Sequence, residues 1–119
     1  MRIIEVTENK KEHLALLLLA DEQEDMIDRY LDWGIMYVLE DDGIKAECVV
    51  TDEGDGILEI KNIATNSAHQ RKGYGKALID FVSGQYAGEY SITAVNIYDL
   101  IVLDWGVFCH SKKLRIPGT

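Results

Sequence analysis

Three apolar segments follow one another between residues 35 and 65, and only a few turn residues separate them. The segments read IMYVLE (35–40), IKAECVVT (44–51) and ILEIKNIAT (57–65), and the turns between them read DDG and DEGDG. Asp-Gly pairs between such segments predict β-hairpins, because these residues accept the positive φ values that tight hairpin turns require. We therefore expect an antiparallel sheet built around this meander.

Two helices are predicted ahead of the meander. Asn9 and Glu12 are three residues apart, as are Asp21 and Glu24, and this is the spacing of a capping box. Each pair precedes a run of residues with helical periodicity, so each is expected to begin a helix. Gly34 follows the second run and is expected to be its C-cap.

The remaining segments complete an α+β pattern. Residues 1–8 alternate loosely and predict a first strand, apolar residues at helical spacing predict a helix from about residue 75, and residues 90–95 predict a last strand. The order β-α-α-β-β-β-α-β predicts a mixed, mostly antiparallel sheet flanked by helices. A chain of 119 residues is expected to form a single domain over 1–119.

Charge and cysteine usage exclude several classes of protein. The net charge is −9, divided between −12 in residues 1–60 and +3 in residues 61–119. The acidic total argues against a nucleic-acid partner, and aspartates interrupt the apolar runs that a membrane span needs. Cys48 and Cys109 form no CxxC pattern, so no disulfide framework and no metal site are expected, and the cytoplasm is the predicted location.

Positive charge gathers at one place in the second half. Arg71, Lys72 and Lys76 surround Gly73 and Gly75, just where the third helix is expected to begin. The first amides of a helix have no helical partner, and the helix dipole favours an anion beside them. Glycines let a ligand approach this backbone closely. The segment therefore predicts a pyrophosphate site, although an ordinary turn at the start of a helix also explains the two glycines.

The spacing of the glycines distinguishes among phosphate motifs. GxxxxGK[ST] is absent, and GxGxxG fails because Leu78 stands at its third glycine. QRKGYG matches the motif Gln/Arg-x-x-Gly-x-Gly/Ala in full, with Gln70, Gly73 and Gly75 at the fixed positions. With a strand before this motif and a helix after it, the chain resembles the GNAT superfamily of N-acetyltransferases over residues 1–95.

The resemblance implies a sheet whose fourth and fifth strands diverge and hold the pantetheine arm of acetyl-coenzyme A (acetyl-CoA) between them. It implies acetyl-CoA as the co-substrate and no metal. The implied binding residues are Ile63, Ala64 and Thr65 for the pantetheine, and Gln70, Arg71, Lys72, Gly73, Tyr74, Gly75 and Lys76 for the pyrophosphate.

The resemblance also implies direct attack of a primary amine, carried by a small molecule or a peptide, on the thioester. A base must take the proton of the amine. Glu59 is the candidate base, because it lies on the fourth strand and faces away from Leu58 and Ile60. Simple exposure to solvent explains Glu59 equally well. His69 is expected to be a surface residue, and the two cysteines are expected to be core thiols.

The tail, residues 96–119, departs from the family pattern. Relatives continue with Asn-x-x-Ala and a tyrosine four residues before Gly-Phe, and this tyrosine protonates the departing thiolate. Here Asn96 fits, Asp99 replaces the alanine and Val102 stands in the place of the tyrosine. We expect incomplete C-terminal strands, with at most one in the tail. The apolar tail then predicts either a homodimer or a fold back onto the domain.

Three functions remain open from the sequence. The first is an N-acetyltransferase whose acidic half attracts an amine, and the second is a coenzyme A-binding relative that is catalytically weak or inactive. The third is an interaction module without a nucleotide ligand. All but the third should bind coenzyme A, and only the first should release free thiol from acetyl-CoA in the presence of amines.

Overall fold

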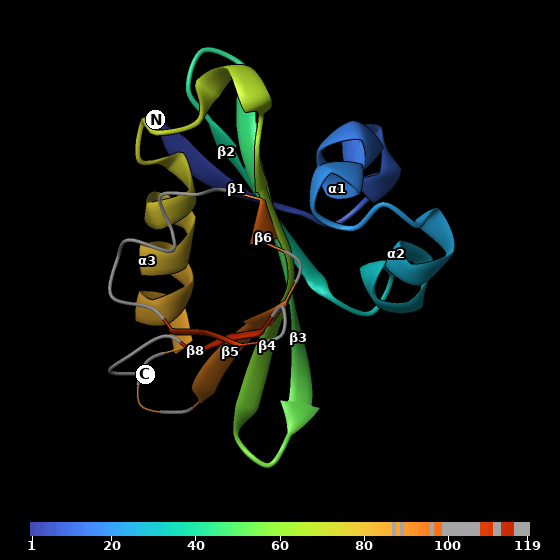
Figure 1. Cartoon of the computed structure of the whole chain (residues 1–119), viewed down its shortest axis with the longest axis vertical. Helices are drawn as coiled ribbons and strands as arrows, with labels where there is room; N and C mark the ends of the chain where they lie inside the picture. Colours follow the sequence, from blue (N-terminus) through green and yellow to red (C-terminus); the bar gives the residue numbers. More distant parts are fainter. Residues whose placement is uncertain (87, 89, 96, 99–107, 111–112, 116–119) are drawn as a thin grey trace.

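One sheet with helices on both faces makes up the fold in the computed structural model, which describes residues 1–86, 88, 90–95, 97–98, 108–110 and 113–115 (Figure 1). The strand order is β1-β2-β3-β4-β5-β8-β7, and β6 pairs with β4 outside this path. The strands are β1 (Arg2–Val6), β2 (Ile35–Glu40), β3 (Ile44–Gly54), β4 (Ile57–Thr65), β5 (Ser91–Val95), β6 (Ile97–Tyr98), β7 (Phe108–His110) and β8 (Lys113–Arg115). The helices are η1 (Lys10–His13), α1 (Leu14–Ala20), α2 (Glu24–Leu31), η2 (Ser67–His69) and α3 (Tyr74–Tyr86).

The predicted meander is confirmed. β2, β3 and β4 pair antiparallel in sequence order, and β1 adds to β2 in the same sense. Asp42 and Gly43 have φ values of 55° and 98°, which are the positive values that a tight hairpin turn demands. β5 runs parallel to β4, so the α+β class with a mixed, mostly antiparallel sheet is confirmed as well.

A β-bulge bends β4 in its middle. Val49 pairs with Asn62 but its neighbour Val50 pairs with Ile60, so Lys61 is an extra residue on β4. Pairing between β4 and β5 ends at Ile60 and Ala94, directly before the bulge. The bulge therefore marks the point at which the two parallel strands stop pairing.

The two faces of the sheet carry separate apolar clusters (Figure 1). On one face α3 packs Leu78, Ile79 and Val82 against the sheet. On the other face α1 and α2 pack Leu17 and Ile27, among others, against β2 and β3. Within the described residues, no helix is long and apolar enough to cross a membrane.

Both predicted capping boxes are wrong. Asn9 has a left-handed φ of 52°, its side chain makes no capping bond, and the turn that follows is the short 3-10 helix η1. Gln23, rather than Asp21, precedes the first residue of α2. The carboxylate of Asp21 accepts the N–H of Gln23 at 3.4 Å and the hydroxyl of Tyr30 at 3.2 Å, so it serves a local turn and a tertiary contact together.

Gly34 ends the α2 region for a different reason than expected. Its N–H donates to the carbonyl of Tyr30 at 2.9 Å, but its φ lies outside the left-handed region. A Cβ at this position would stand 2.8 Å from the Tyr30 oxygen and 2.9 Å from a methyl of Val49. Close packing of α2 against β3 therefore requires the glycine.

The tail supplies more of the sheet than predicted. β8 pairs antiparallel with β5, from Thr93 with Arg115 to Val95 with Lys113, and β7 pairs with β8. The expectation of at most one strand is wrong, because the tail contains β6, β7 and β8, and strands of two or three residues need little chain. β8 thus covers, within the same chain, the edge of β5 that motivated the homodimer prediction.

Candidate functional site

The predicted anion site lies in the loop between β4 and α3. Asn66 begins η2, and its side chain accepts the N–H of Ala68 at 3.0 Å. Arg71 and Gly73 then adopt left-handed φ values of 66° and 85°. Alternation of this kind gathers backbone amides into concavities that bind anions. A Cβ on Gly73 would meet no atom within 4 Å, so the loop is open at this residue.

The first turn of α3 follows directly. The first helical bond runs from the N–H of Ala77 to the carbonyl of Gly73 at 2.9 Å. The amides of residues 73–75 precede it in the first turn, where helical amides have no partner within the helix. Such amides, together with the dipole of a 13-residue helix, form a site for an anion.

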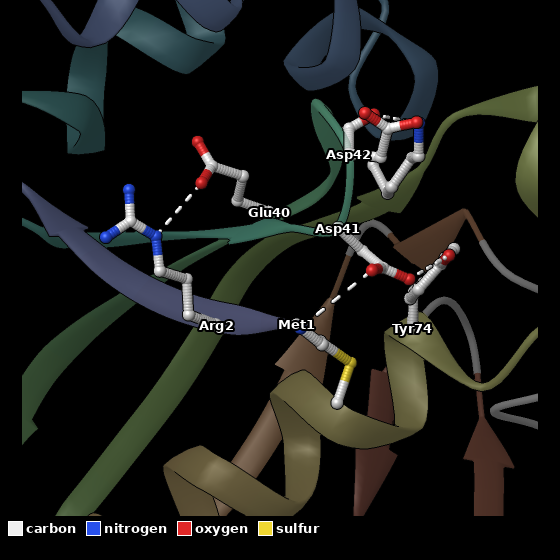
Figure 2. A network of polar contacts seen from close by, with 7 residues as sticks. Met1, Arg2, Glu40, Asp41, Asp42 and Tyr74 are labelled. Atoms are coloured by element: carbon white, nitrogen blue, oxygen red, sulfur yellow. Dashed lines mark hydrogen bonds and ion pairs between the residues drawn. The ribbon is translucent and has the colours of Figure 1, made fainter.

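Tyr74 anchors this turn to the sheet. Its ring is buried, and its hydroxyl donates to a carboxylate oxygen of Asp41 at 2.7 Å (Figure 2). This hydrogen bond raises the pKa of Tyr74. The other carboxylate oxygen of Asp41 lies 3.8 Å from the terminal amine of Met1, and Arg2 pairs with Glu40 nearby. Tyr74 therefore offers the site its backbone amide, while its side chain fixes the start of α3 against the turn between β2 and β3.

Positive charge surrounds the loop. Arg71 and Lys72 are exposed, while Lys76 forms an ion pair of 2.8 Å with Asp80 one turn along α3. His69 is half-buried rather than on the surface as expected. Its pKa is lowered by burial first and then by the charges of Lys45 and Lys72. The site thus disfavours a further cation and favours an anion.

The predicted pantetheine residues lie at the C-terminal end of β4. Ile63, Ala64 and Thr65 are fully buried, and Gln70 approaches the carbonyl of Thr65 at 3.5 Å. β6 pairs in parallel with Ile63 and Ala64, beyond the bulge, where β5 no longer pairs with β4. A segment of the chain itself therefore lies beside the backbone that the family resemblance assigns to pantetheine.

Glu59 lies at the other end of β4. Leu58 and Ile60 are buried on the face covered by α3, as predicted, and Glu59 faces away from them with 15% of its side chain exposed. It forms an ion pair of 2.9 Å with Lys61. Five residues separate it from Ala64, which is about 16 Å along a strand. Its role as a base stays a prediction.

A buried polar group that the sequence analysis missed lies on β3. Glu47 is fully buried, and neither of its carboxyl oxygens has a hydrogen-bond partner among the described residues. Burial raises its pKa well above the ordinary value of 4.5, and the nearby backbone amide of Ala64 offsets only part of this effect. The available signal was an acid inside the apolar run AECVV on a strand covered on both faces.

Asn62 and Tyr30 lie on the same face as Glu47. Asn62 is fully buried and donates to the carbonyl of Leu17 at 2.9 Å and to the hydroxyl of Tyr30 at 3.0 Å. Its amide oxygen has no partner in the described part of the chain. Glu47 and Asn62 thus lie beside Ala64 on the face of the sheet that α1 and α2 cover, and Tyr30 of α2 contacts Asn62 there.

Other predicted features have simpler outcomes. Cys48 is a buried core thiol as expected, and burial raises its pKa. The residues compared with the family's asparagine and tyrosine motif, Asn96, Asp99 and Val102, lie outside the described residues. Among the residues that are described, no group of three or more metal-ligating side chains comes together.

Comparison with known proteins identifies the family of the chain. Residues 32–104 match the family model for the acetyltransferase (GNAT) domain. The chain is 37% identical over 78 residues to the Bacillus subtilis protein named "Uncharacterized N-acetyltransferase YvbK", covering 64% of this chain and 50% of that protein. It therefore spans about half the length of this curated relative.

Solved structures agree on the fold. A B. subtilis acetyltransferase in complex with CoA superposes with a TM-score of 0.70 at 32% identity, over 78% of this chain and 63% of that one. A GNAT family acetyltransferase from Elizabethkingia anophelis with acetyl-CoA bound gives 0.72 at 21% identity, over 96% and 94% of the two chains. Because the family model matches more than half of this chain, the chain belongs to the GNAT family of acetyltransferases.

Proposed function

We propose that this chain binds acetyl-CoA and transfers its acetyl group to a primary amine of a small molecule or peptide in the cytoplasm. The observation that carries the proposal is the QRKGYG loop at the start of α3, with left-handed backbone at Arg71 and Gly73 and free space at Gly73. The similar B. subtilis acetyltransferase was solved with CoA, which supports the same ligand here.

The pyrophosphate would lie against the amides of residues 73–75, with Arg71 and Lys72 supplying charge. Lys76 is engaged by Asp80, so its side chain would contribute less charge to the site. Because Arg71 and Lys72 are exposed, their contribution should weaken as the salt concentration rises.

The pantetheine arm would take the edge of β4 at Ile63 and Ala64. β6 pairs with the same two residues, so acetyl-CoA and β6 compete for one set of backbone groups. Binding then includes the cost of displacing β6, which lowers the apparent affinity relative to a chain with a free edge.

The acceptor side of the proposal rests on charge. Residues 1–60 carry a net charge of −12, which attracts an ammonium group to the α1–α2 face and the hairpins beside it. A homodimer through residues 96–119 stays a prediction, and light scattering over a dilution series tests it. A catalytically weak or inactive coenzyme A-binding protein remains the second candidate, because Val102 stands where relatives carry the acid.

A matched pair of glycine variants tests the proposal. Gly73 and Gly54 share nearly the same φ, 85° and 84°, and a Cβ on either meets nothing within 4 Å. Gly54 lies at the far end of the β3–β4 hairpin, away from the loop (Figure 1). Gly73→Val and Gly54→Val should therefore strain the fold alike, while only Gly73→Val blocks approach to the amides.

Isothermal titration with acetyl-CoA and with free CoA measures the outcome. We expect the parent and Gly54→Val to bind both ligands and Gly73→Val to lose affinity by at least tenfold. Equal affinity in all three proteins would refute the loop as the pyrophosphate site. Release of free thiol with an amine panel then separates the acetyltransferase from the inactive coenzyme A-binding alternative.

A further inference from the structure

Glu47 is a carboxyl group that the fold buries without pairing it. Its side chain has no exposed surface, and both oxygens lack a partner within the described residues. Buried polar groups are nearly always hydrogen-bonded, and an unpaired one is costly. An acid kept in such a position calls for a functional explanation, and a role in catalysis is one known explanation for an unpaired buried group.

The position of Glu47 leads to the reactive end of the proposed ligand. Glu47 pairs with Ala64 across β3 and β4, and Ala64 pairs with Tyr98 of β6 on its other side. The place beside β4 is thus two strand spacings from β3, or about 10 Å. On this face of β4, only the methyl group of Ala64 stands between Glu47 and that place.

The direction of the ligand brings its thioester towards the same place. With the pyrophosphate at the start of α3, the pantetheine runs back along β4 from Thr65 towards the bulge at Lys61. In the proposed complex the thioester would lie beside Asn62, which shares a face with Glu47 and carries a buried oxygen that has no partner among the described residues.

We propose that Glu47, rather than Glu59, is the general base that accepts the proton of the attacking amine. The inference rests on the proposed function and names the catalytic residue within that site. Glu59 is held in an ion pair with Lys61 and lies on the part of β4 where β5 still pairs with it. Glu47 has no such cationic partner among the described residues and lies next to the diverging end of β4.

The chemistry balances without any further reactant. The nitrogen of the neutral amine forms a bond to the thioester carbon, and Glu47 takes the proton that the nitrogen loses. The carbon–sulfur bond breaks with its electron pair on sulfur, and the thiolate takes a proton from solvent. Glu47 returns its proton to solvent, so the products are the amide and free CoA.

The surroundings of Glu47 set its pH dependence. Tyr30 on α2 is close enough to feel the charge of Glu47, and its hydroxyl donates to the carboxylate of Asp21, which lies before α2. Glu59, ion-paired with Lys61, faces the same side further along β4. Cys48 follows Glu47 on β3, and Asn62 is the uncharged polar neighbour on β4. Val38 on β2 and the residues of α1 present apolar side chains. Burial among these groups raises the pKa of Glu47, so the rate should rise with pH as the carboxyl ionises.

The test compares Glu47→Gln, Glu47→Asp and Glu59→Gln with the parent in two measurements. Isothermal titration gives acetyl-CoA affinity, and thiol release gives turnover from pH 6 to pH 10, with an amine panel and with water alone as acceptor. We expect Glu47→Gln to retain acetyl-CoA affinity within about threefold while turnover falls by about 10²-fold or more and keeps only the rise with pH that ionisation of the amine itself gives. Glu47→Asp should retain part of the turnover, and Glu59→Gln should lose less than Glu47→Gln.

Each contrary outcome has its own meaning. A Glu47→Gln variant with parental turnover, or one that keeps the parental pH profile, overturns the role of Glu47 and leaves the proposed function standing. Loss in Glu59→Gln alone assigns the base to Glu59. A parent that binds no acetyl-CoA overturns the proposed function, and a parent that binds it but releases thiol no faster than buffer overturns catalysis, each taking the role of Glu47 with it.

Discussion

Replacement of Glu47 by glutamine should change how the stability of the fold depends on pH. Complete burial raises the pKa of this carboxyl well above its ordinary value of 4.5. A group whose pKa is raised by folding contributes stability that is fully present below the unfolded pKa and is lost as pH rises towards the folded pKa. The parent should therefore lose stability from Glu47 as pH rises above about 4.5, while Glu47→Gln has no proton to lose there.

The magnitude follows from proton linkage for one group. Between the unfolded and folded pKa values, the free energy of unfolding of the parent should fall relative to that of Glu47→Gln by up to about 1.4 kcal/mol for each pH unit of increase. For 119 residues, unfolding entropy near 60 °C is about 250 cal/mol/K, so this fall corresponds to about 5 °C in Tm per pH unit. Contributions from all other groups cancel in the difference.

Thermal unfolding of both proteins at pH 5, 6, 7 and 8 measures this difference. Glu59→Gln is the matched comparison, because it removes the same charge from a half-buried, ion-paired site on the neighbouring strand. Parallel curves for the parent and Glu47→Gln would refute the reasoning, since they would mean that Glu47 titrates alike in the folded and unfolded chain. This readout depends on no ligand and no acceptor.

Two further changes have sharp expectations. Gly34→Ala should destabilise the fold by about 1–3 kcal/mol in chemical denaturation, because a Cβ would stand 2.8 Å from the carbonyl oxygen of Tyr30. Its control is Gly84→Ala in α3, where a Cβ meets nothing within 4 Å and the change should stabilise the fold by about 0.5–1 kcal/mol. Equal effects of the two changes would contradict the packing explanation. The double variant Ile97→Pro and Tyr98→Pro should tighten acetyl-CoA binding in isothermal titration by roughly 5-fold to 100-fold. Proline has no N–H to donate to β4, and the two residue pairs involve hydrogen bonds of about 0.5–1.5 kcal/mol each. Unchanged or weaker binding would show that β6 does not compete with the ligand.

The sequence predicted those parts of the fold that local residues determine. The bounds of β2 and β4 follow from the Asp-Gly turns that flank them, since positive φ at Asp42 and Gly43 is a local requirement. The loop before α3 was likewise identified from glycine spacing. The helix starts were wrong because Asn9 and Asp21 met conditions that distant residues set, as the bond from Tyr30 to Asp21 illustrates.

The features around the candidate site that depend on tertiary pairing were not predicted. The bulge at Lys61 exists only in the register between β3 and β4, and the contact of β6 with Ile63 joins residues 34 positions apart. Glu47 was part of an expected strand, but its isolation follows from α1 and α2 covering that face of the sheet. An acid in the middle of an apolar strand is therefore a signal worth following once both faces of the sheet are known to be covered.

The proposed competition between β6 and acetyl-CoA would connect the fold of the tail to the activity of the site. If a fraction of the molecules has β6 away from β4, the apparent dissociation constant equals the intrinsic one divided by that fraction. Under the proposed function, the loop at Gly73 would set the intrinsic affinity, whereas the pairing of Ile97 and Tyr98 with β4 would set the fraction. The two contributions separate experimentally, because Gly73→Val should weaken binding by the same factor with or without prolines in β6. Weak binding by the parent could thus have two causes, a tail that covers β4 or a loop that binds poorly. The proline variants separate them, because prolines in β6 restore affinity only in the first case.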